Sequence, residues 1–152
     1  MQAAIRTITV VFILIILGSA LWASSPGAVY LNSVEGSAEY LPAVSQRWLP
    51  ARANTALAEG DALLVTGGNA EVFVRDGSLL RVTRGSRLKV LSVERSAIQF
   101  SLESGRAYVN FKGLKGYPLF LSTPSAQIDV FERAAFRVDI GAGGDTEISV
   151  FA

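Results

Sequence analysis

The fold is decided by residues 60–82, which read GDALLVTGGNAEVFVRDGSLLRV. Runs of apolar and β-branched residues flank Asp76-Gly77, and this dipeptide favours a two-residue type I′ turn because both central residues need a positive φ. Such a turn pairs Val74 with Leu79. One face of the hairpin then carries Val72, Val74 and Leu79, and the other carries Phe73, Leu80 and Val82. Because both faces are apolar, we expect the hairpin to lie inside the fold and not at an edge.

Strand-like alternation continues outward from this hairpin. Apolar and polar residues alternate with the period of two of a half-buried strand over residues 98–102, 107–111, 136–140 and 148–150. Hairpin turns are expected at Gly105 and at residues 141–145, and weaker strands at residues 28–34, 36–41 and 62–66. No helical periodicity follows residue 24. We therefore predict an all-β domain, an antiparallel β-sandwich or roll of about ten to twelve short strands, with a short β-solenoid as the alternative.

The N-terminus is the apolar part of the chain. Arg6 precedes a run without charge, residues 7–23, which predicts one hydrophobic helix serving as a signal peptide or a transmembrane anchor. Cleavage after Ala23 would place Leu21 at the −3 position, where a small residue is preferred, and both readings stay open. Residues 24–27 are a predicted linker and residues 28–152 the exported domain. We expect it to be periplasmic or extracytoplasmic, anchored in the inner membrane through residues 7–23 or released after cleavage.

The composition restricts the chemistry available to the chain. It has 14 Lys and Arg against 13 Asp and Glu, and neither His nor Cys. Catalytic triads and dyads that need His or Cys, thiol redox chemistry and the usual zinc and iron–sulfur sites are therefore excluded. A net charge of +1 gives no field that would attract nucleic acid. We expect no enzymatic activity, no metal and no cofactor.

Several short motifs, taken in order, resemble the FecR domain family. The opening pair Val34-Glu35-Gly36 and the tryptophan at Trp48 precede the Gly60-Asp61 strand and the Asp76-Gly77-Ser78 turn. Further matching segments are residues 102–107, 122–126, 136–138 and 146–150. The resemblance covers residues 28–152 and implies an exported all-β recognition domain that binds a protein partner in sensing or signalling. Only six residues precede the apolar run, so we do not expect the cytoplasmic anti-sigma segment that FecR-type regulators carry.

Two sets of residues are candidates for a partner surface. Basic residues that would suit an anionic surface or an acidic partner are Arg81, Arg84, Arg87 and Lys89. Aromatic residues that would anchor a protein or stack on a sugar are Tyr108, Tyr117 and Phe120. The plainer interpretation places the basic residues at solvated turns and sheet edges, and the aromatic ones in the core with one wet edge. Asp61 and Asp76 are expected to cap backbone groups in turns, not to bind a ligand.

Three functions remain open at this point. The first is a non-enzymatic envelope domain that recognises a protein partner through a sheet face or an edge strand. The second is a structural module of the envelope that associates with itself. The third is a carbohydrate-binding module built on the aromatic residues between Tyr108 and Phe120.

Overall fold

The computed structural model describes residues 28–151 and is all-β, as predicted. Eleven strands of these residues join one sheet, within the expected range. Their bounds are β1 Val29–Leu41, β2 Leu49–Pro50, β3 Ala62–Val74, β4 Leu79–Thr83, β5 Arg87–Val93, β6 Ile98–Ser104, β7 Arg106–Phe111, β8 Leu119–Ser122, β9 Gln127–Val130, β10 Ala134–Ile140 and β11 Thr146–Phe151.

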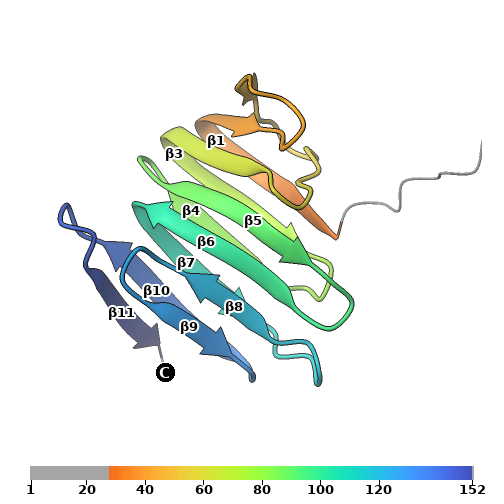
Figure 1. Ribbon diagram of the computed structural model, residues 1–152, viewed down its shortest axis with the longest axis vertical. Coiled ribbons are helices and arrows are strands. Elements are labelled where there is room, and N and C mark those ends of the chain that lie inside the picture. The colour runs from red at the N-terminus through yellow and green to blue at the C-terminus, as the bar shows by residue number, and fades with distance from the viewer. Residues whose placement is uncertain (1–27, 152) are drawn as a thin grey trace, which may run out of the picture.

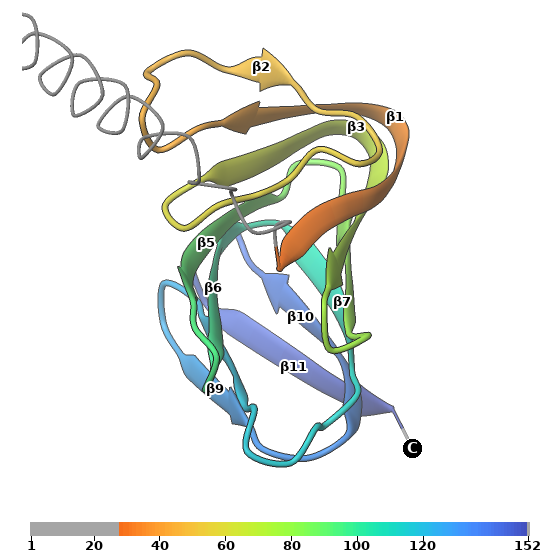
Figure 2. The ribbon, with the colours of Figure 1, turned by 90° about the vertical axis from the view of Figure 1, so that its right-hand side faces the viewer.

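Strand β3 organises the sheet. Its whole length pairs with β1 on one side, while on the other side its first part pairs with β5 and its second part with β4. Two arms therefore diverge from β3: arm A, in the order β4, β7, β10 and β11, and arm B, in the order β5, β6, β8 and β9. The arms curl toward each other into a half-barrel, which Figure 1 shows from the side of arm B and Figure 2 shows edge-on.

The core fills the space between the arms. Alternation along each strand turns every second side chain inward, and large fully buried residues come from both arms, among them Leu80, Phe111, Leu88 and Phe100. The two ends of the curl also touch, because the hydroxyl of Thr146 at the start of β11 lies 2.7 Å from that of Thr123, next to β8. Among the described strands, β6 and β8 form the one parallel pair. The stacked parallel coils of the solenoid alternative are not formed by residues 28–151.

The hairpin at Asp76-Gly77 has a longer turn than predicted. Phe73 pairs with Leu79 in place of Leu80, so three residues form the turn and the predicted two-residue register is wrong. The reason is the side chain of Asp76, which accepts hydrogen bonds from the Ser78 backbone N–H at 2.8 Å and the Ser78 hydroxyl at 2.7 Å. This one-residue shift gathers the buried side chains on a single face, namely Ala70, Val72, Val74, Leu80 and Val82. The predicted interior position is confirmed, since β3 and β4 have neighbours on both sides.

The predicted hairpin at Gly105 is wrong in a more consequential way. β6 and β7 do not pair with each other, because β6 belongs to arm B and β7 to arm A. Gly105 is the corner at which the chain passes between the arms, with a φ of 84°. The buried hydroxyl of Ser86 holds this corner, accepting the Arg106 N–H at 2.8 Å and donating to the Arg106 carbonyl at 3.0 Å.

The weaker predicted strands merge into longer ones. Residues 28–34 and 36–41 form the single strand β1, and the strand predicted at residues 62–66 continues to Val74. Gly36 and Gly68 face each other across these two strands, and both have a positive φ. The pair of strands bends over the top of the half-barrel (Figure 2). Predictions for residues 1–23 and 24–27 lie outside the described residues. Within residues 28–151, the structure has no helix long and apolar enough to cross a membrane.

Candidate partner-binding face

The outer face of arm A carries a row of polar and aromatic side chains. Cross-strand pairing places Glu71 opposite Arg81, Arg81 opposite Tyr108, Tyr108 opposite Arg137, and Arg137 opposite Ser149. Glu71, Arg81, Tyr108 and Arg137 lie on the face turned away from the core, because their neighbours along each strand, such as Val82 and Val109, are buried. Ser149 lies on the same face because it is the cross-strand partner of Arg137. We call these five residues the polar row.

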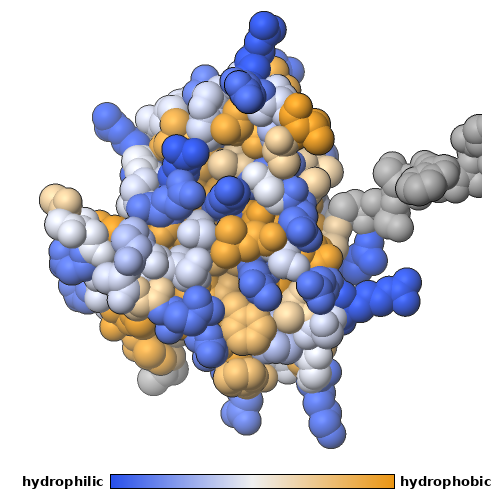
Figure 3. Space-filling model, in the orientation of Figure 1, coloured by the Kyte–Doolittle hydropathy of each residue, from blue (hydrophilic) through white to orange (hydrophobic). Residues whose placement is uncertain are grey.

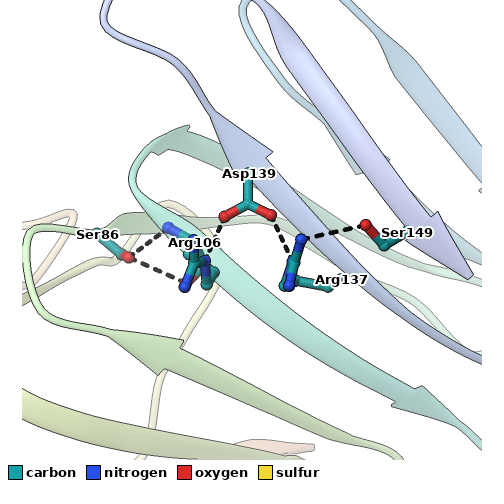
Figure 4. Close-up of polar contacts among 5 residues, drawn as sticks. All are labelled: Ser86, Arg106, Arg137, Asp139 and Ser149. Carbon is teal, nitrogen blue, oxygen red and sulfur yellow. Dashed lines mark hydrogen bonds and ion pairs between the residues drawn. The ribbon is translucent and has the colours of Figure 1, made fainter. Parts of the chain in front are cut away.

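One end of the polar row is held by a shared carboxylate. Asp139 accepts hydrogen bonds from the Nε of Arg106 and, at 2.5 Å, from the Nε of Arg137, while Arg137 also donates to the Ser149 hydroxyl at 3.2 Å (Figure 4). Burial alone would raise the pKa of the Asp139 carboxyl, but the two arginine hydrogen bonds outweigh burial and hold that pKa below its ordinary value. Strands β7, β10 and β11 are thus linked by one ionised group.

The other end is organised by Glu71. Its carboxylate accepts a hydrogen bond from Arg81 Nη2 at 2.6 Å and another from Asn32 Nδ2 at 3.0 Å. These bonds, Arg81 first, lower the pKa of the Glu71 carboxyl, and Glu71 in turn raises the pKa of Arg81. The face is therefore ionised and pre-ordered at neutral pH: Arg81 contacts Glu71 through both Nε and Nη2, whereas Arg106 and Arg137 each contact Asp139 through Nε.

Acidification is expected to weaken the fold through these two carboxylates. The folded protein holds both pKa values below the ordinary 4.5 of glutamate and 3.8 of aspartate. As the pH falls, the unfolded chain therefore binds protons first, and the free energy of unfolding decreases below about pH 4.5. Urea unfolding at a series of pH values measures this dependence.

The control for this prediction is a pair of double variants. Glu71→Gln with Asp139→Asn should flatten the pH dependence, whereas Glu39→Gln with Asp129→Asn, away from this face, should leave it in place. Equal slopes for the two double variants would contradict the role given to Glu71 and Asp139.

An apolar part of the face borders the polar row. The rings of Tyr108 and Phe151 stack with their centroids 6.4 Å apart, beside a shallow depression of about 260 Å³ that Leu79 and Ala135 also line. Phe151 belongs to β11, the last strand of arm A, and 47% of it is exposed. Both rings offer apolar contact area, and the hydroxyl of Tyr108 adds a polar group.

Strand β11 differs from its prediction as a half-buried strand. Ile148 is 45% exposed and Val150 is 75% exposed, although their cross-strand partners Val138 and Phe136 are in the core. The exposure arises because β11 is the outermost strand of arm A, paired with β10 on one side only. Within residues 28–151, no strand pairs with the outer edge of β11, and apolar side chains are exposed beside that edge.

The predicted partner residues are distributed over several surfaces. Arg81 and Tyr108 are neighbours in the polar row, and Arg84 lies exposed in the connection between β4 and β5. Tyr117 lies at one end of the half-barrel, where it lines a separate cavity. Their role in binding a partner remains a prediction.

The remaining predicted residues, Arg87, Lys89 and Phe120, belong to arm B. On the side of the molecule that arm B forms, hydrophobic and hydrophilic side chains are interspersed (Figure 3). The guanidinium of Arg87 lies 5.4 Å from the ring centroid of Trp48, and its Nε lies 2.8 Å from a carboxylate oxygen of Glu103, as an ion pair without hydrogen-bond geometry. Phe120 packs edge-on against Phe131, with centroids 6.1 Å apart. The structure thus brings together Arg81 and Tyr108 and separates them from the other five.

Sequence reasoning missed several members of the face, namely Glu71, Arg106, Arg137, Asp139 and Ser149. The alternation of β7 and β10 shows that Arg106, Arg137 and Asp139 point outward, but it does not show that the two strands are neighbours. Asp61 and Asp76 serve the backbone, as predicted: Asp61 accepts the N–H groups of Ala43 and Ala58, and Asp76 that of Ser78. Within residues 28–151, no group of three potential ligand residues could hold a metal ion.

Comparison with known proteins adds one match. A family model described as FecR protein matches residues 61–152, which run from the start of β3 through β11 and include every member of the polar row. No curated protein and no solved structure matches the chain significantly.

Proposed function

The chain belongs to the FecR family, and on this premise we propose that it is a non-enzymatic recognition domain of the cell envelope that binds a protein partner in sensing or signalling. FecR domains are typically non-enzymatic, and the family implies a sensing role. The observation that carries the proposal is the outer edge of β11, which no other strand of residues 28–151 pairs with, together with the exposed Ile148 and Val150.

The proposed mechanism is addition of a partner strand to this edge. An extended segment that pairs with β11 gains main-chain hydrogen bonds and covers apolar side chains that water otherwise surrounds. The adjacent polar row and the Tyr108–Phe151 stack supply side-chain selectivity, because their arginine and aromatic groups are already ordered before the partner arrives. In this mechanism, the edge of β11 provides most of the affinity for the partner strand, and the outer face of arm A selects among partners.

The proposed location is the extracytoplasmic side of a membrane. The uncharged run of residues 7–23 after Arg6 suits an inner-membrane anchor or a signal peptide, and it supports export of the strands that follow. In either form, residues 28–152 meet a partner inside the envelope.

Replacing Val150 with lysine is expected to abolish partner capture while leaving the fold intact. A lysine on the edge strand opposes strand addition by its charge and by the cost of burying it. We expect at least about a tenfold loss of the captured partner, which corresponds to about 1.4 kcal/mol. The measurement is chemical crosslinking of the full-length protein in its own membranes, followed by mass spectrometry of what is captured.

The matched control is Val44→Lys, since Val44 is fully exposed in the loop before β2. It makes the same change in charge and should retain the partner. If both variants capture as much partner as the unaltered chain, recognition does not use β11.

A structural module that associates with itself is the second candidate function. The same edge favours it, because β11 of one copy could pair with β11 of another and continue the sheet. Self-crosslinks alone, lost in Val150→Lys, would support this alternative. Carbohydrate binding by Tyr108, Tyr117 and Phe120 together is less favoured, because the three lie on different surfaces.

A further inference from the structure

A second surface lies at one end of the half-barrel, separate from β11. Here a cavity of about 670 Å³, which we call the mouth pocket, opens between four segments that face the viewer in Figure 2. Its lining comes from the start of β1, the β3–β4 turn, the β5–β6 turn and the β7–β8 connection: Ala28, Arg75, Asp76, residues 93–95 and residues 114–117.

The rim of the mouth pocket carries an excess of positive charge. Arg75, Arg95 and Lys115 are exposed, and Lys112 packs against the neighbouring turn, its Cγ within 3.5 Å of where a Cβ on Gly77 would lie. Two carboxylates line the same pocket. Both oxygens of Asp76 accept hydrogen bonds from Ser78, and Glu94 accepts one from Ser92 at 3.3 Å. Three cations and two carboxylates therefore line the pocket, and Lys112 adds a further positive charge beside it.

Beyond this rim, Glu132 and Arg133 lie against the backbone at Gly113 and add one charge of each sign. They leave the excess of positive charge unchanged. The chain as a whole has a net charge of only +1, so the positive character is local to this end of the half-barrel.

An apolar side chain projects among these charges. Leu114 is 51% exposed and lies next to Lys115 in the β7–β8 connection, with partly buried Val93 on the opposite turn. Basic residues around an exposed leucine suit the membrane interface, where the cations meet phosphate groups and the apolar group enters the acyl boundary. Burial in this pocket also raises the pKa of the Tyr117 hydroxyl, so Tyr117 stays neutral beside an anionic surface.

The course of the chain places this pocket near a bilayer. Ala28 is both the first described residue and part of the pocket lining. Only the four residues 24–27 separate it from the apolar run of residues 7–23, and four extended residues span at most about 14 Å. With residues 7–23 in a membrane, Ala28, at the edge of the pocket, is held within about two Debye lengths of the headgroups at physiological ionic strength.

We propose that the mouth pocket docks onto the anionic phospholipid headgroups of the membrane that holds residues 7–23. The proposal goes beyond partner recognition and rests on the anchored form of the proposed function. β11 contributes no residue to the pocket lining, so docking leaves the partner edge open. Residues 24–27 would keep the domain near the bilayer even without docking. Docking of the basic residues then determines which end of the half-barrel faces the bilayer.

The test uses the full chain in nanodiscs of phosphatidylcholine alone or mixed with an equal amount of phosphatidylglycerol. The chain has no cysteine, so Leu114→Cys accepts one fluorescent label, which is quenched by spin-labelled lipid when position 114 reaches the headgroups. Val44→Cys carries the control label on the β1–β2 loop. We expect quenching at position 114 in the anionic discs only, weakened by added salt, and none at position 44.

The charge dependence is tested with Arg95→Gln and Lys115→Gln together. Each basic residue near an anionic surface changes the docking equilibrium about fivefold, so their joint loss should weaken it about 30-fold. The matched pair Arg47→Gln and Arg52→Gln, exposed in loops of the β1–β3 connection, should have no effect. Equal thermal unfolding of the two double variants shows that any loss of docking is not a loss of fold.

Three results would overturn the proposal: no quenching at position 114, equal quenching in both kinds of disc, or a chain that does not stay in the discs. None of them bears on partner capture through Val150, which is measured separately in native membranes. Failure of headgroup docking and failure of the proposed recognition function are thereby distinguished.

Discussion

Replacing Gly68 with alanine is expected to remove a large part of the stability of the domain. Gly68 lies on β3 with a φ of 68°, opposite Gly36 of β1. A Cβ there would lie 1.8 Å from the carbonyl oxygen of Glu35 and 2.8 Å from its carbon. The obstacle is backbone, so the two longest strands would have to separate where they bend. We expect the free energy of unfolding to fall by at least about 4 kcal/mol, which is a large part of the about 5–15 kcal/mol typical of a domain of this size. Urea unfolding followed by circular dichroism measures the loss.

The matched control is Gly116→Ala. Gly116 has a similar φ of 77°, but nothing lies within 4 Å of its added Cβ. This variant carries the backbone strain of a positive φ without the collision, and it should cost about 1–2 kcal/mol. If Gly68→Ala were no more destabilising than Gly116→Ala, the close approach of β1 and β3 would not be a requirement of the fold.

Replacing Asp61 with alanine is expected to have the second largest effect. The side chain is only 6% exposed, and its two oxygens accept the backbone N–H groups of Ala43 and Ala58, each at 2.8 Å. These two bonds hold the long connection between β1 and β3. Hydrogen bonds to a charged group contribute about 1.5–3 kcal/mol each, so we expect a loss of about 3–4 kcal/mol in the free energy of urea unfolding.

Two variants locate the cause of that loss. Asp61→Asn keeps one oxygen acceptor and should lose roughly half as much, since the other backbone N–H faces an amide group. Asp129→Ala, at an exposed position on β9, should stay within about 0.5 kcal/mol of the unaltered chain. An Asp61→Ala protein as stable as Asp129→Ala would show that water replaces the lost acceptor.

The sequence predicts the strands well because each strand carries its own evidence. The alternation over residues 98–102, 107–111 and 136–140 reappears as buried and half-buried positions in β6, β7 and β10. Asp61 and Asp76 were also assigned correctly, since a carboxylate beside a turn glycine accepts hydrogen bonds from nearby backbone N–H groups, such as those of Ala58 and Ser78.

What the sequence does not specify is which strand lies beside which. Gly105 has the local pattern of a hairpin, but the strands before and after it join opposite arms. The deciding contact is with Ser86, far away along the chain. The predicted register of the turn at Asp76-Gly77 was wrong for another reason. The side chain of Asp76 stabilises a three-residue turn, which brings Phe73 opposite Leu79.

The same limit applies to the candidate site. Arg81 and Tyr108 were predicted from composition, but their proximity depends on the pairing of β4 with β7. The Arg106–Asp139–Arg137 cluster depends on the pairing of β7 with β10. A cluster whose residues come from distant strands can be predicted only when the topology is known. A turn contact such as that of Asp76 with Ser78 can be predicted from neighbouring residues.

The central claim, recognition through β11, is tested most directly by a photoreactive amino acid at position 150 of the full-length protein in its native membranes. We predict an adduct with one defined envelope protein at position 150 and none at position 44, which is fully exposed on the β1–β2 loop. The absence of any adduct at position 150, or the same adducts at both positions, would contradict the account.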